Sequence, residues 1–437
     1  MDSINFNLGE KDPLLDQARQ IIGNAGSASA TRLQRELNIG FARAGRIIEE
    51  LERQRQESFS EPTPRPAPPL ECLLPTTDNF MMPSSQMLKA VAQKLTEVLE
   101  ACGVGVADIK VVYGYSYHLF KVYVTPGTKV SKVRERADDI AVGIGVEGVR
   151  ITVLEDCIGV EIPIGERRRI GMRELLTGPE ATKHHSTMTL PLFLGKDINH
   201  RTFAIDLAKA PHILIAGAAG QGKSQIVDTM ICSLLYSDKD VKFLLIDPNE
   251  GMVEWRNLPE EFFFEARRDV VSAEEALAAL RSLHAELESR YDTLSREKVK
   301  NIADFQKKGG VMGYILCVMD EFAQYVRCCP DKGIRREVQK EMVFLASKGR
   351  AVGIHLVLTT QRPSVDAISG IIKANFPVRI AVRTVSAVDS IVILDIPGAE
   401  KLTGQGDMLL SQGAKLTRVQ AAEISESEKE KILGITN

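Results

Sequence analysis

Short apolar runs alternate with amphipathic stretches through the C-terminal half of the chain. The runs are HILIAG, VKFLLID, YILCVMD, IHLVLTT and VRIAVRT, which begin at residues 212, 241, 314, 354 and 378. Runs of this kind are typical of strands that are buried on both faces of a parallel sheet. Helical segments lie between them, so an α/β architecture is predicted for residues 176–437.

Residues 78–175 have a different pattern, in which helices and strands are mixed. The spacing predicts an amphipathic helix in SQMLKAVAQKLTEVLEACG and a pair of strands in IKVVYGYSYHLFKVYVTPG, which ends in a Pro-Gly turn. A second helix, KVRERADDIAVGIG, and two more strands, VRITVLED and IGVEIPIG, follow. We therefore predict a small α+β domain, in which we find no chemical motif.

The first 56 residues predict a helical unit. Apolar residues have helical spacing in DPLLDQARQIIGNAG, from residue 12, and in FARAGRIIEELERQ, from residue 41. The segment SASATRLQRELNIG lies between them and ends in a tight turn that contains glycine, which is the helix-turn-helix pattern. Residues 57–77 are rich in proline, which disfavours both helix and central strand, so this segment is predicted to be an extended linker.

The composition is that of an ordinary globular protein. Of the 437 residues, 44% are hydrophobic and 26% are charged, and the formal net charge is -3. No run of about 18 apolar residues occurs, which predicts no transmembrane helix, and the acidic, polar start is unlike a secretory signal. The seven cysteines form no CxxC pair, so neither a zinc site nor a disulfide framework is indicated. We expect a cytoplasmic protein.

The strongest chemical motif is GAAGQGKS at 217–224, which matches the P-loop pattern GxxxxGK[ST]. Glycines let successive backbone N–H groups point at phosphate oxygens, and the following helix adds the positive end of its dipole. Lys223 is expected to reach the β- and γ-phosphates of ATP, and Ser224 to bind Mg²⁺. The other expected nucleotide contacts are Gly217, Gly220, Gly222 and Gln225.

A P-loop needs an acidic partner, and the run YILCVMDEF supplies one. Asp320 would sit at the tip of a buried strand and hold Mg²⁺ directly or through water. Glu321, beside it, is the natural general base for an attacking water. A single carboxylate would leave switch-like nucleotide binding open, whereas the pair favours hydrolysis.

Two further residues are candidates for the same chemistry. Gln361 lies at the end of the strand IHLVLTT, where ligands of open α/β sheets bind, and it can sense the γ-phosphate; a hydrogen bond at the strand end is the alternative. Arg350 precedes that strand and could act as an arginine finger on a neighbouring subunit, worth several powers of ten in rate. An exposed arginine near a helix end is the alternative for Arg350.

In the N-terminal unit, Arg43 and Arg46 are spaced i,i+3 and so share one face of the last helix. A recognition helix places such residues against base edges in the major groove, where arginine reads guanine. We predict DNA contacts by Arg43 and Arg46, and by Arg32 on the preceding helix. A solvated charged face on a protein-binding bundle is the alternative.

Taken together, these segments resemble the FtsK/SpoIIIE family of DNA translocases. The resemblance is carried by DLAKAPHILIAGAAGQGKS, by YILCVMDEFA, and over the greatest length by KGRAVGIHLVLTTQRPSVDAISGIIKANFPVRIAVRTVSAVDSIVILDIPGAEKLTGQGDMLL. Residues 78–175 resemble the family's α domain and residues 176–437 its RecA-like β motor domain. Residues 1–56 resemble its γ domain, a winged helix, although that unit is usually C-terminal to the motor. The family's usual multi-pass membrane anchor is not expected in this chain.

The resemblance implies a homohexameric ring that encircles double-stranded DNA and moves along it by hydrolysing ATP. It also places a trans-acting arginine near Arg350. A near-neutral net charge is compatible with DNA binding, because a few basic residues lining a pore suffice. The alternatives are a related motor that moves protein in secretion, a coupling protein for single-stranded DNA, and a DNA-binding regulator that ATP switches between oligomeric states.

Overall fold

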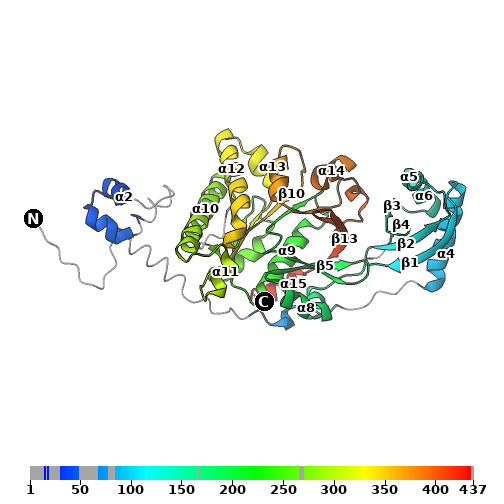
Figure 1. Cartoon of the computed structure of the whole chain (residues 1–437), viewed down its shortest axis with the longest axis horizontal. Coiled ribbons are helices and arrows are strands. Elements are labelled where there is room, and N and C mark those ends of the chain that lie inside the picture. Colours follow the sequence, from blue (N-terminus) through cyan, green and yellow to red (C-terminus); the bar gives the residue numbers. More distant parts are fainter. Residues whose placement is uncertain are drawn as a thin grey trace, which may run out of the picture.

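Two β-sheets organise the protein, as the computed structural model shows (Figure 1). The structure describes residues 14–15, 17–18, 30–48, 67–76, 84–165, 167–264 and 270–434. A four-stranded antiparallel sheet has the order β1-β2-β4-β3, and a nine-stranded mixed sheet has the order β6-β5-β13-β12-β11-β7-β10-β9-β8. The predicted α/β architecture with a preceding α+β unit is confirmed.

The four-stranded sheet and its helices form the α+β unit. Ser84 caps the first helix by accepting a hydrogen bond from the Met87 amide, and the unit has its own apolar core, which includes Leu95, Phe120 and Val160. Its elements are α4 (Ser85–Ala101), β1 (Val106–Tyr113), β2 (Tyr117–Val124), α5 (Val130–Glu135), α6 (Ala137–Ile144), β3 (Arg150–Val153) and β4 (Ile158–Pro163).

The large sheet has a parallel half and an antiparallel half. Strands β11, β7, β10, β9 and β8 are parallel, and β12, β13, β5 and β6 continue the sheet in antiparallel pairs. The strands are β5 (Pro191–Asp197), β6 (Thr202–Asp206), β7 (His212–Ala216), β8 (Val241–Ile246), β9 (Tyr314–Met319), β10 (Ile354–Thr360), β11 (Val378–Val382), β12 (Asp407–Gln412) and β13 (Lys415–Ala421). All five predicted apolar runs are therefore parallel strands.

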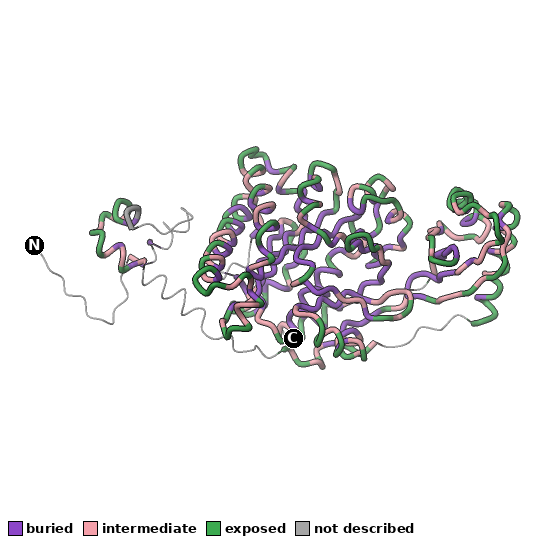
Figure 2. The backbone as a smooth tube through the Cα atoms, viewed as in Figure 1, coloured by how far each residue is buried: buried purple, intermediate pink, exposed green. Residues whose placement is uncertain are grey.

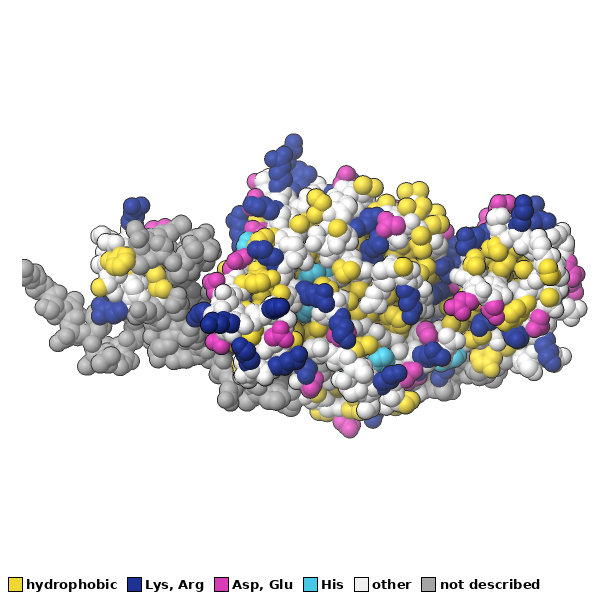
Figure 3. All heavy atoms as spheres, in the orientation of Figure 1, with side chains coloured by type: hydrophobic (Ala, Val, Ile, Leu, Met, Phe, Trp, Pro, Cys, Tyr) yellow, Lys and Arg dark blue, Asp and Glu magenta, His cyan; other side chains and the backbone are white. Residues whose placement is uncertain are grey.

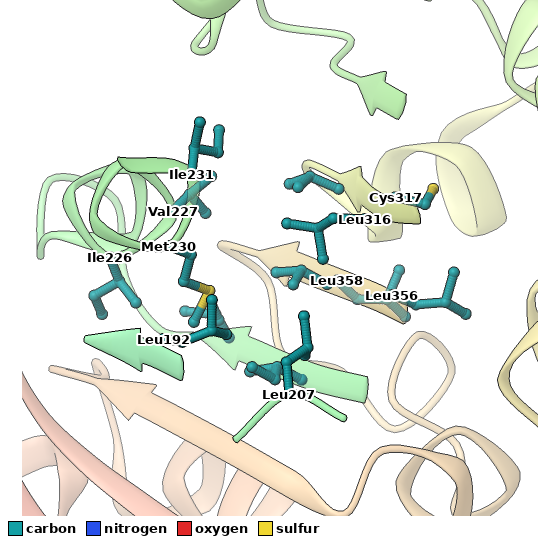
Figure 4. Close-up of a cluster of buried hydrophobic side chains, with 14 of the residues drawn as sticks. Leu192, Leu207, Ile226, Val227, Met230, Ile231, Leu316, Cys317, Leu356 and Leu358 are labelled. Carbon is teal, nitrogen blue, oxygen red and sulfur yellow. The ribbon is translucent and has the colours of Figure 1, made fainter. Parts of the chain in front are cut away.

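Helices cover the large sheet, and the strands are the most deeply buried part of the molecule (Figure 2). Figure 4 shows side chains of α9 beside Leu192 on β5, facing Leu316 on β9 and Leu358 on β10. The helices are α7 (Met172–Thr177), α8 (Pro179–Thr187), α9 (Lys223–Leu235), α10 (Ala273–Arg296), α11 (Ile302–Lys307), α12 (Lys332–Lys348), α13 (Gly370–Asn375), α14 (Ala387–Leu394) and α15 (Glu426–Ile432).

Part of the segment predicted as a linker, residues 67–76, contacts the C-terminal helix. Leu73 is fully buried, and the Leu74 amide donates to Glu428 Oε1 at 2.8 Å. The stretch Leu70–Cys72 is a short 3₁₀ helix. The proline-rich pattern could not reveal this contact, because the partner residues lie more than 350 positions away.

The described part of the N-terminal unit includes helical residues at 15 and 17–18. It also includes two successive helices, α2 (Ala30–Glu36) and residues 41–48. A four-residue turn joins them, in which Asn38 has a φ of +52°. Leu33, Ala44 and Ile47 are buried together, as the predicted stripe requires. The helix-turn-helix spacing is thus present. Among the described residues, no helix has the length and apolar character that crossing a bilayer requires.

Candidate nucleotide-binding site

The loop between β7 and α9 is shaped by glycines that no other residue could replace without strain. Gly217, Gly220 and Gly222 have φ values of +148°, +71° and +101°. A Cβ atom at Gly222 would lie 2.3 Å from the Gly406 amide nitrogen, and one at Gly217 would lie 2.5 Å from a methyl of Val382. The loop therefore follows a path that brings its backbone close to two neighbouring segments.

Lys223 begins α9 and lies over the loop. Its side chain is buried, and Nζ donates to the carbonyl oxygens of Gly217 at 2.9 Å and Ala218 at 2.7 Å. Burial lowers the pKa of Lys223 to about 8, although Glu321 and Asp320 oppose the shift. The ammonium group is thus held where phosphate oxygens would meet it.

The two residues after Lys223 have different surroundings. Ser224, in the first turn of α9, is exposed and its hydroxyl is accessible to a ligand. Gln225 uses its side-chain amide to bond the Ala422 carbonyl at 2.9 Å. Gln225 therefore ties the start of α9 to the segment after β13, which is a contact that the sequence did not predict.

Asp320 and Glu321 follow β9 at the same edge of the sheet. Because β7, β10 and β9 are parallel neighbours, with Thr360 opposite Ala216 and Leu358 opposite Met319, their carboxyl ends meet there. Burial raises the pKa of Asp320, and a hydrogen bond from Thr359 opposes the shift. A nearby positive charge would restore the ionised carboxylate, as a metal ion does.

Glu321 has a left-handed backbone conformation, with a φ of +44°. For a non-glycine residue this conformation costs about 1–3 kcal/mol and persists only where the surroundings hold it. They do so here: Glu321 Oε1 accepts from the Thr360 hydroxyl at 3.0 Å, and Oε2 accepts from the Gln361 amide at 2.9 Å. The side chain is thus aimed across the end of β10 and is almost fully buried.

Three residues at the end of β10 therefore form hydrogen bonds to the two acids. The hydroxyls of Thr359 and Thr360 bind Asp320 and Glu321, respectively, whereas Gln361 contributes its backbone N–H and exposes its side chain. The sequence suggested Gln361 as a polar residue at a ligand edge. The role of Thr359 was missed, and its signal was the Thr-Thr pair that ends an otherwise apolar strand.

Arg350 lies at the opposite end of the parallel strands, where β10 begins. It belongs to a short 3₁₀ helix, Gly349–Val352, which precedes β10, and its side chain is exposed. The seven residues of β10 separate it from the phosphate-binding loop, which at about 3.3 Å per residue is about 23 Å. Arg350 is thus too far away to act on a nucleotide bound to the same chain.

The predicted DNA-binding arginines occupy two successive helices. Arg43 and Arg46 lie on the helix 41–48, and Arg46 is exposed, whereas Arg43 is half-buried. Arg32 lies on α2, the preceding helix. The buried residues of the second helix, Ala44 and Ile47, occupy other positions, so Arg46 faces away from the core.

Three segments of the chain match families of known proteins. Residues 173–365 match the FtsK/SpoIIIE family, residues 67–164 match the FtsK alpha domain, and residues 9–58 match the Ftsk gamma domain. The DNA translocase FtsK of Haemophilus influenzae is 35% identical over 410 residues, which cover 86% of this chain and 76% of that protein. The chain belongs to the FtsK/SpoIIIE family. The resemblance stated from the motifs is confirmed.

The chain spans about half the length of several curated relatives that it matches. The DNA translocase FtsK of Chlorobaculum tepidum is 40% identical over 363 residues, which cover 79% of this chain but 44% of that protein. The fold is also similar to that of a solved structure, the pCW3 conjugation coupling protein TcpA with ATPgS. The TM-score is 0.55 and the sequence identity is 22%, and the match covers 79% of this chain and 99% of that one. At this identity the likeness establishes the RecA-like fold of the ATPase core.

Proposed function

We propose that this chain hydrolyses ATP and uses the reaction to move along double-stranded DNA. The observation that carries the proposal is the meeting of Lys223, Asp320 and Glu321 at one edge of the parallel sheet. Such a meeting is the arrangement that phosphoryl transfer requires. DNA enters the proposal because the FtsK relatives are named DNA translocases.

The residues present fit Mg-ATP. The Gly217 and Ala218 amides donate to the Thr360 and Arg383 carbonyls. The backbone amides of 219–222 and the dipole of α9 suit the phosphates, and Lys223 adds a positive charge. Mg²⁺ prefers oxygen ligands, and Ser224 and Asp320 would supply a hydroxyl and a carboxylate. When bound, the ion would neutralise charge on the phosphates. Among the described residues, no cluster of three or more acidic, His or Cys ligands competes for it.

Glu321 is the proposed general base. Two hydrogen bonds fix its carboxylate beside the end of β10, so it can take a proton from a water that attacks the γ-phosphate. The exposed side chain of Gln361, next to it, would orient that water or sense the γ-phosphate. Both roles place the chemistry at the carboxyl edge of the sheet.

Nucleotide affinity is expected to fall as the pH rises above about 8. Phosphate oxygens beside Lys223 would raise its pKa from about 8, so binding takes up a proton. The contribution is fully present below pH 8 and is lost as the pH rises through the higher pKa of the complex, by up to about tenfold in affinity per pH unit. Titration of a fluorescent ATP analogue from pH 7 to 9.5 measures the effect; a constant affinity above pH 8 would contradict it.

We propose that the active assembly is a ring of identical subunits in which Arg350 reaches the nucleotide of a neighbour. About 23 Å separates Arg350 from the phosphate-binding loop of its own chain. Arg350 could therefore contact only a nucleotide that is bound to a neighbouring subunit. Arg350→Ala should lower turnover by about 10³-fold or more, with nucleotide binding unchanged. The control is Arg134→Ala, an exposed arginine on α5.

Mixing decides whether Arg350 acts in trans. Combining Arg350→Ala subunits with Lys223→Ala subunits should restore part of the activity, because a mixed interface pairs an intact Lys223 with an intact Arg350. Mixtures that stay as inactive as the two separate variants would contradict trans action.

Duplex DNA should stimulate ATP turnover severalfold. On the face that Figure 3 shows, Lys and Arg side chains lie around α10 and α12, with some Asp and Glu side chains among them. The assay compares turnover without DNA, with duplex DNA and with single-stranded DNA, with Lys223→Ala as the blank. A rate indifferent to DNA would remove the proposal, and preference for single strands would favour a coupling protein instead.

A binding competition tests the N-terminal unit, which we propose reads a DNA sequence. The exposed Arg46 and its neighbour Arg43 would contact base edges from the second helix. In binding competition between duplexes, Arg43→Ala/Arg46→Ala should lose sequence preference and keep DNA-independent turnover. A variant that keeps the preference would remove this part of the proposal.

A further inference from the structure

A buried ion cluster joins the four-stranded sheet to the large sheet. Arg418 on β13 donates to both carboxylate oxygens of Asp407 on β12, at 2.9 and 2.5 Å, and to Glu161 on β4. Arg150 on β3 donates to the other oxygen of Glu161 at 2.7 Å. The side chains of Arg418, Asp407 and Glu161 are 5%, 0% and 5% exposed. Little water screens these charges, so they interact strongly.

The cluster keeps its charges and its geometry. Burial alone would lower the pKa of Arg418, but Asp407 and Glu161 outweigh it and raise that pKa well above its ordinary value. The ring of Tyr117 on β2 stacks 3.7 Å from the guanidinium carbon, and burial raises the pKa of its hydroxyl. Strands of both sheets are therefore held to one fixed guanidinium group.

A short loop, residues 403–407, connects this cluster to the phosphate-binding loop. Asp407 Oδ2 accepts hydrogen bonds from the Thr403 amide and hydroxyl, both at 2.8 Å. At the other end, the Gly406 amide donates to the Gln221 carbonyl at 2.9 Å. Asp407 thus closes the loop 403–407 from one side while Gln221, in the P-loop, holds it from the other.

The backbones of the two loops touch at Gly222 and Gly406. A Cβ atom at Gly222 would lie 2.3 Å from the Gly406 amide nitrogen, and one at Gly404 would lie 2.2 Å from Gln221 Oε1. Gly404, Gln405 and Gly406 all have positive φ values, of +83°, +50° and +85°. Because the backbones are in contact there and are joined by the Gly406–Gln221 hydrogen bond, a movement of one loop toward the other displaces it.

We propose that Glu161, Arg418 and Asp407 are positioning residues for the phosphate-binding loop. Glu161 fixes Arg418, Arg418 fixes Asp407, and Asp407 holds the loop 403–407 against Gln221. The seating of the α+β unit on the large sheet thereby sets the affinity for nucleotide. By linkage, nucleotide binding tightens that seating by the same factor. The inference rests on the proposed nucleotide site. It adds that the α+β unit influences the affinity of that site for nucleotide.

The test is the affinity of the full chain for a fluorescent, non-hydrolysable ATP analogue. Glu161→Gln should weaken binding at least about fivefold, the lower end of ordinary coupling between sites. In the wild type, nucleotide should slow amide exchange in β3 and β4, and the variant should lose this protection. Glu161 lies on β4 of the other sheet, so a merely structural role would lower the melting temperature without moving the affinity.

The matched control is Glu286→Gln on α10. Glu286 is as buried as Glu161 and also binds an arginine, Arg290, which bonds the carbonyls of Gly313 and Val352 at the far edge of the sheet. This control should lower the melting temperature and leave the affinity within about twofold of the wild type, well short of the coupling effect. Equal weakening by both variants, or unchanged binding in Glu161→Gln, would overturn the inference.

Arg150→Gln is made in parallel, in case Glu161→Gln does not fold. Arg150 lies at the margin of the cluster and contacts Glu161 alone among its charged groups, so a smaller weakening in the same direction is expected; unchanged binding overturns the inference. A wild-type chain that binds the analogue but does not hydrolyse ATP would remove the proposed activity and leave this inference in place. A wild-type chain that fails to bind it would overturn both.

Discussion

Replacing Lys223 by alanine is expected to lower ATP turnover at least about a hundredfold. The ammonium group lies over the phosphate-binding loop, with Nζ bonded to the Gly217 and Ala218 carbonyls. Phosphate oxygens gain a charge-assisted contact from it that an alanine cannot make. Both binding of a non-hydrolysable analogue and turnover should fall, since the contact exists before and during the reaction.

A matched lysine separates this effect from a general loss of charge. Lys242 is half-buried near the start of β8, at the opposite end of the parallel strands from the nucleotide site. Lys242→Ala should therefore keep wild-type turnover. The melting temperature of Lys223→Ala should be little changed or higher, because burial makes a charged lysine costly at this position. Turnover within a few-fold of the wild type would refute the phosphate-binding role.

Replacing Glu321 by glutamine should act on a different kinetic constant. The amide cannot take a proton from water, so kcat should fall by about 10²–10⁴-fold. The KM for ATP should change little, because Lys223 and the glycine loop are untouched. Single-turnover kinetics with pre-bound ATP measure the chemical step directly, and wild-type turnover would show that the base is another group.

The control for this variant is Glu341→Gln. Glu341 is equally buried, on α12, and its carboxylate binds His284 at 2.6 Å, away from the nucleotide site. Its exchange should cost stability but not kcat. The side-chain oxygen of glutamine at 321 can still accept the hydrogen bond from the Thr360 hydroxyl. Its NH₂ group cannot accept a hydrogen bond from the Gln361 backbone N–H, so a modest fall in melting temperature is also expected.

The pattern of apolar residues was sufficient to predict the buried strands. Runs such as those at 212, 314 and 354 are mostly apolar and short, which suits a strand covered on both sides. The P-loop was equally legible, because positive φ values at 217, 220 and 222 demand glycine, which leaves a signature in the sequence. Such features depend on neighbours a few residues away.

Contacts between distant segments could not be predicted from the sequence. The pairing of Thr359 with Asp320 requires β10 to lie beside β9, and nothing in either run specifies its neighbour. The same is true of Trp255, which has no visible partner in the sequence but is fully buried and donates to Asp228 at 2.7 Å. Strand order and side-chain pairing arise from the packing of the whole sheet.

The sequence by itself determined the type of protein: an α/β chain with a P-loop, an acidic pair after a buried strand and a helical N-terminal unit, each carried by local spacing. Only the tertiary structure decided which groups act together. It placed Glu321 against the end of β10, Arg350 at the opposite edge, and Glu161 on a path to the phosphate-binding loop. The physical reason is that backbone conformation and burial are set by nearby residues, whereas charge pairing at a site depends on which strands become neighbours.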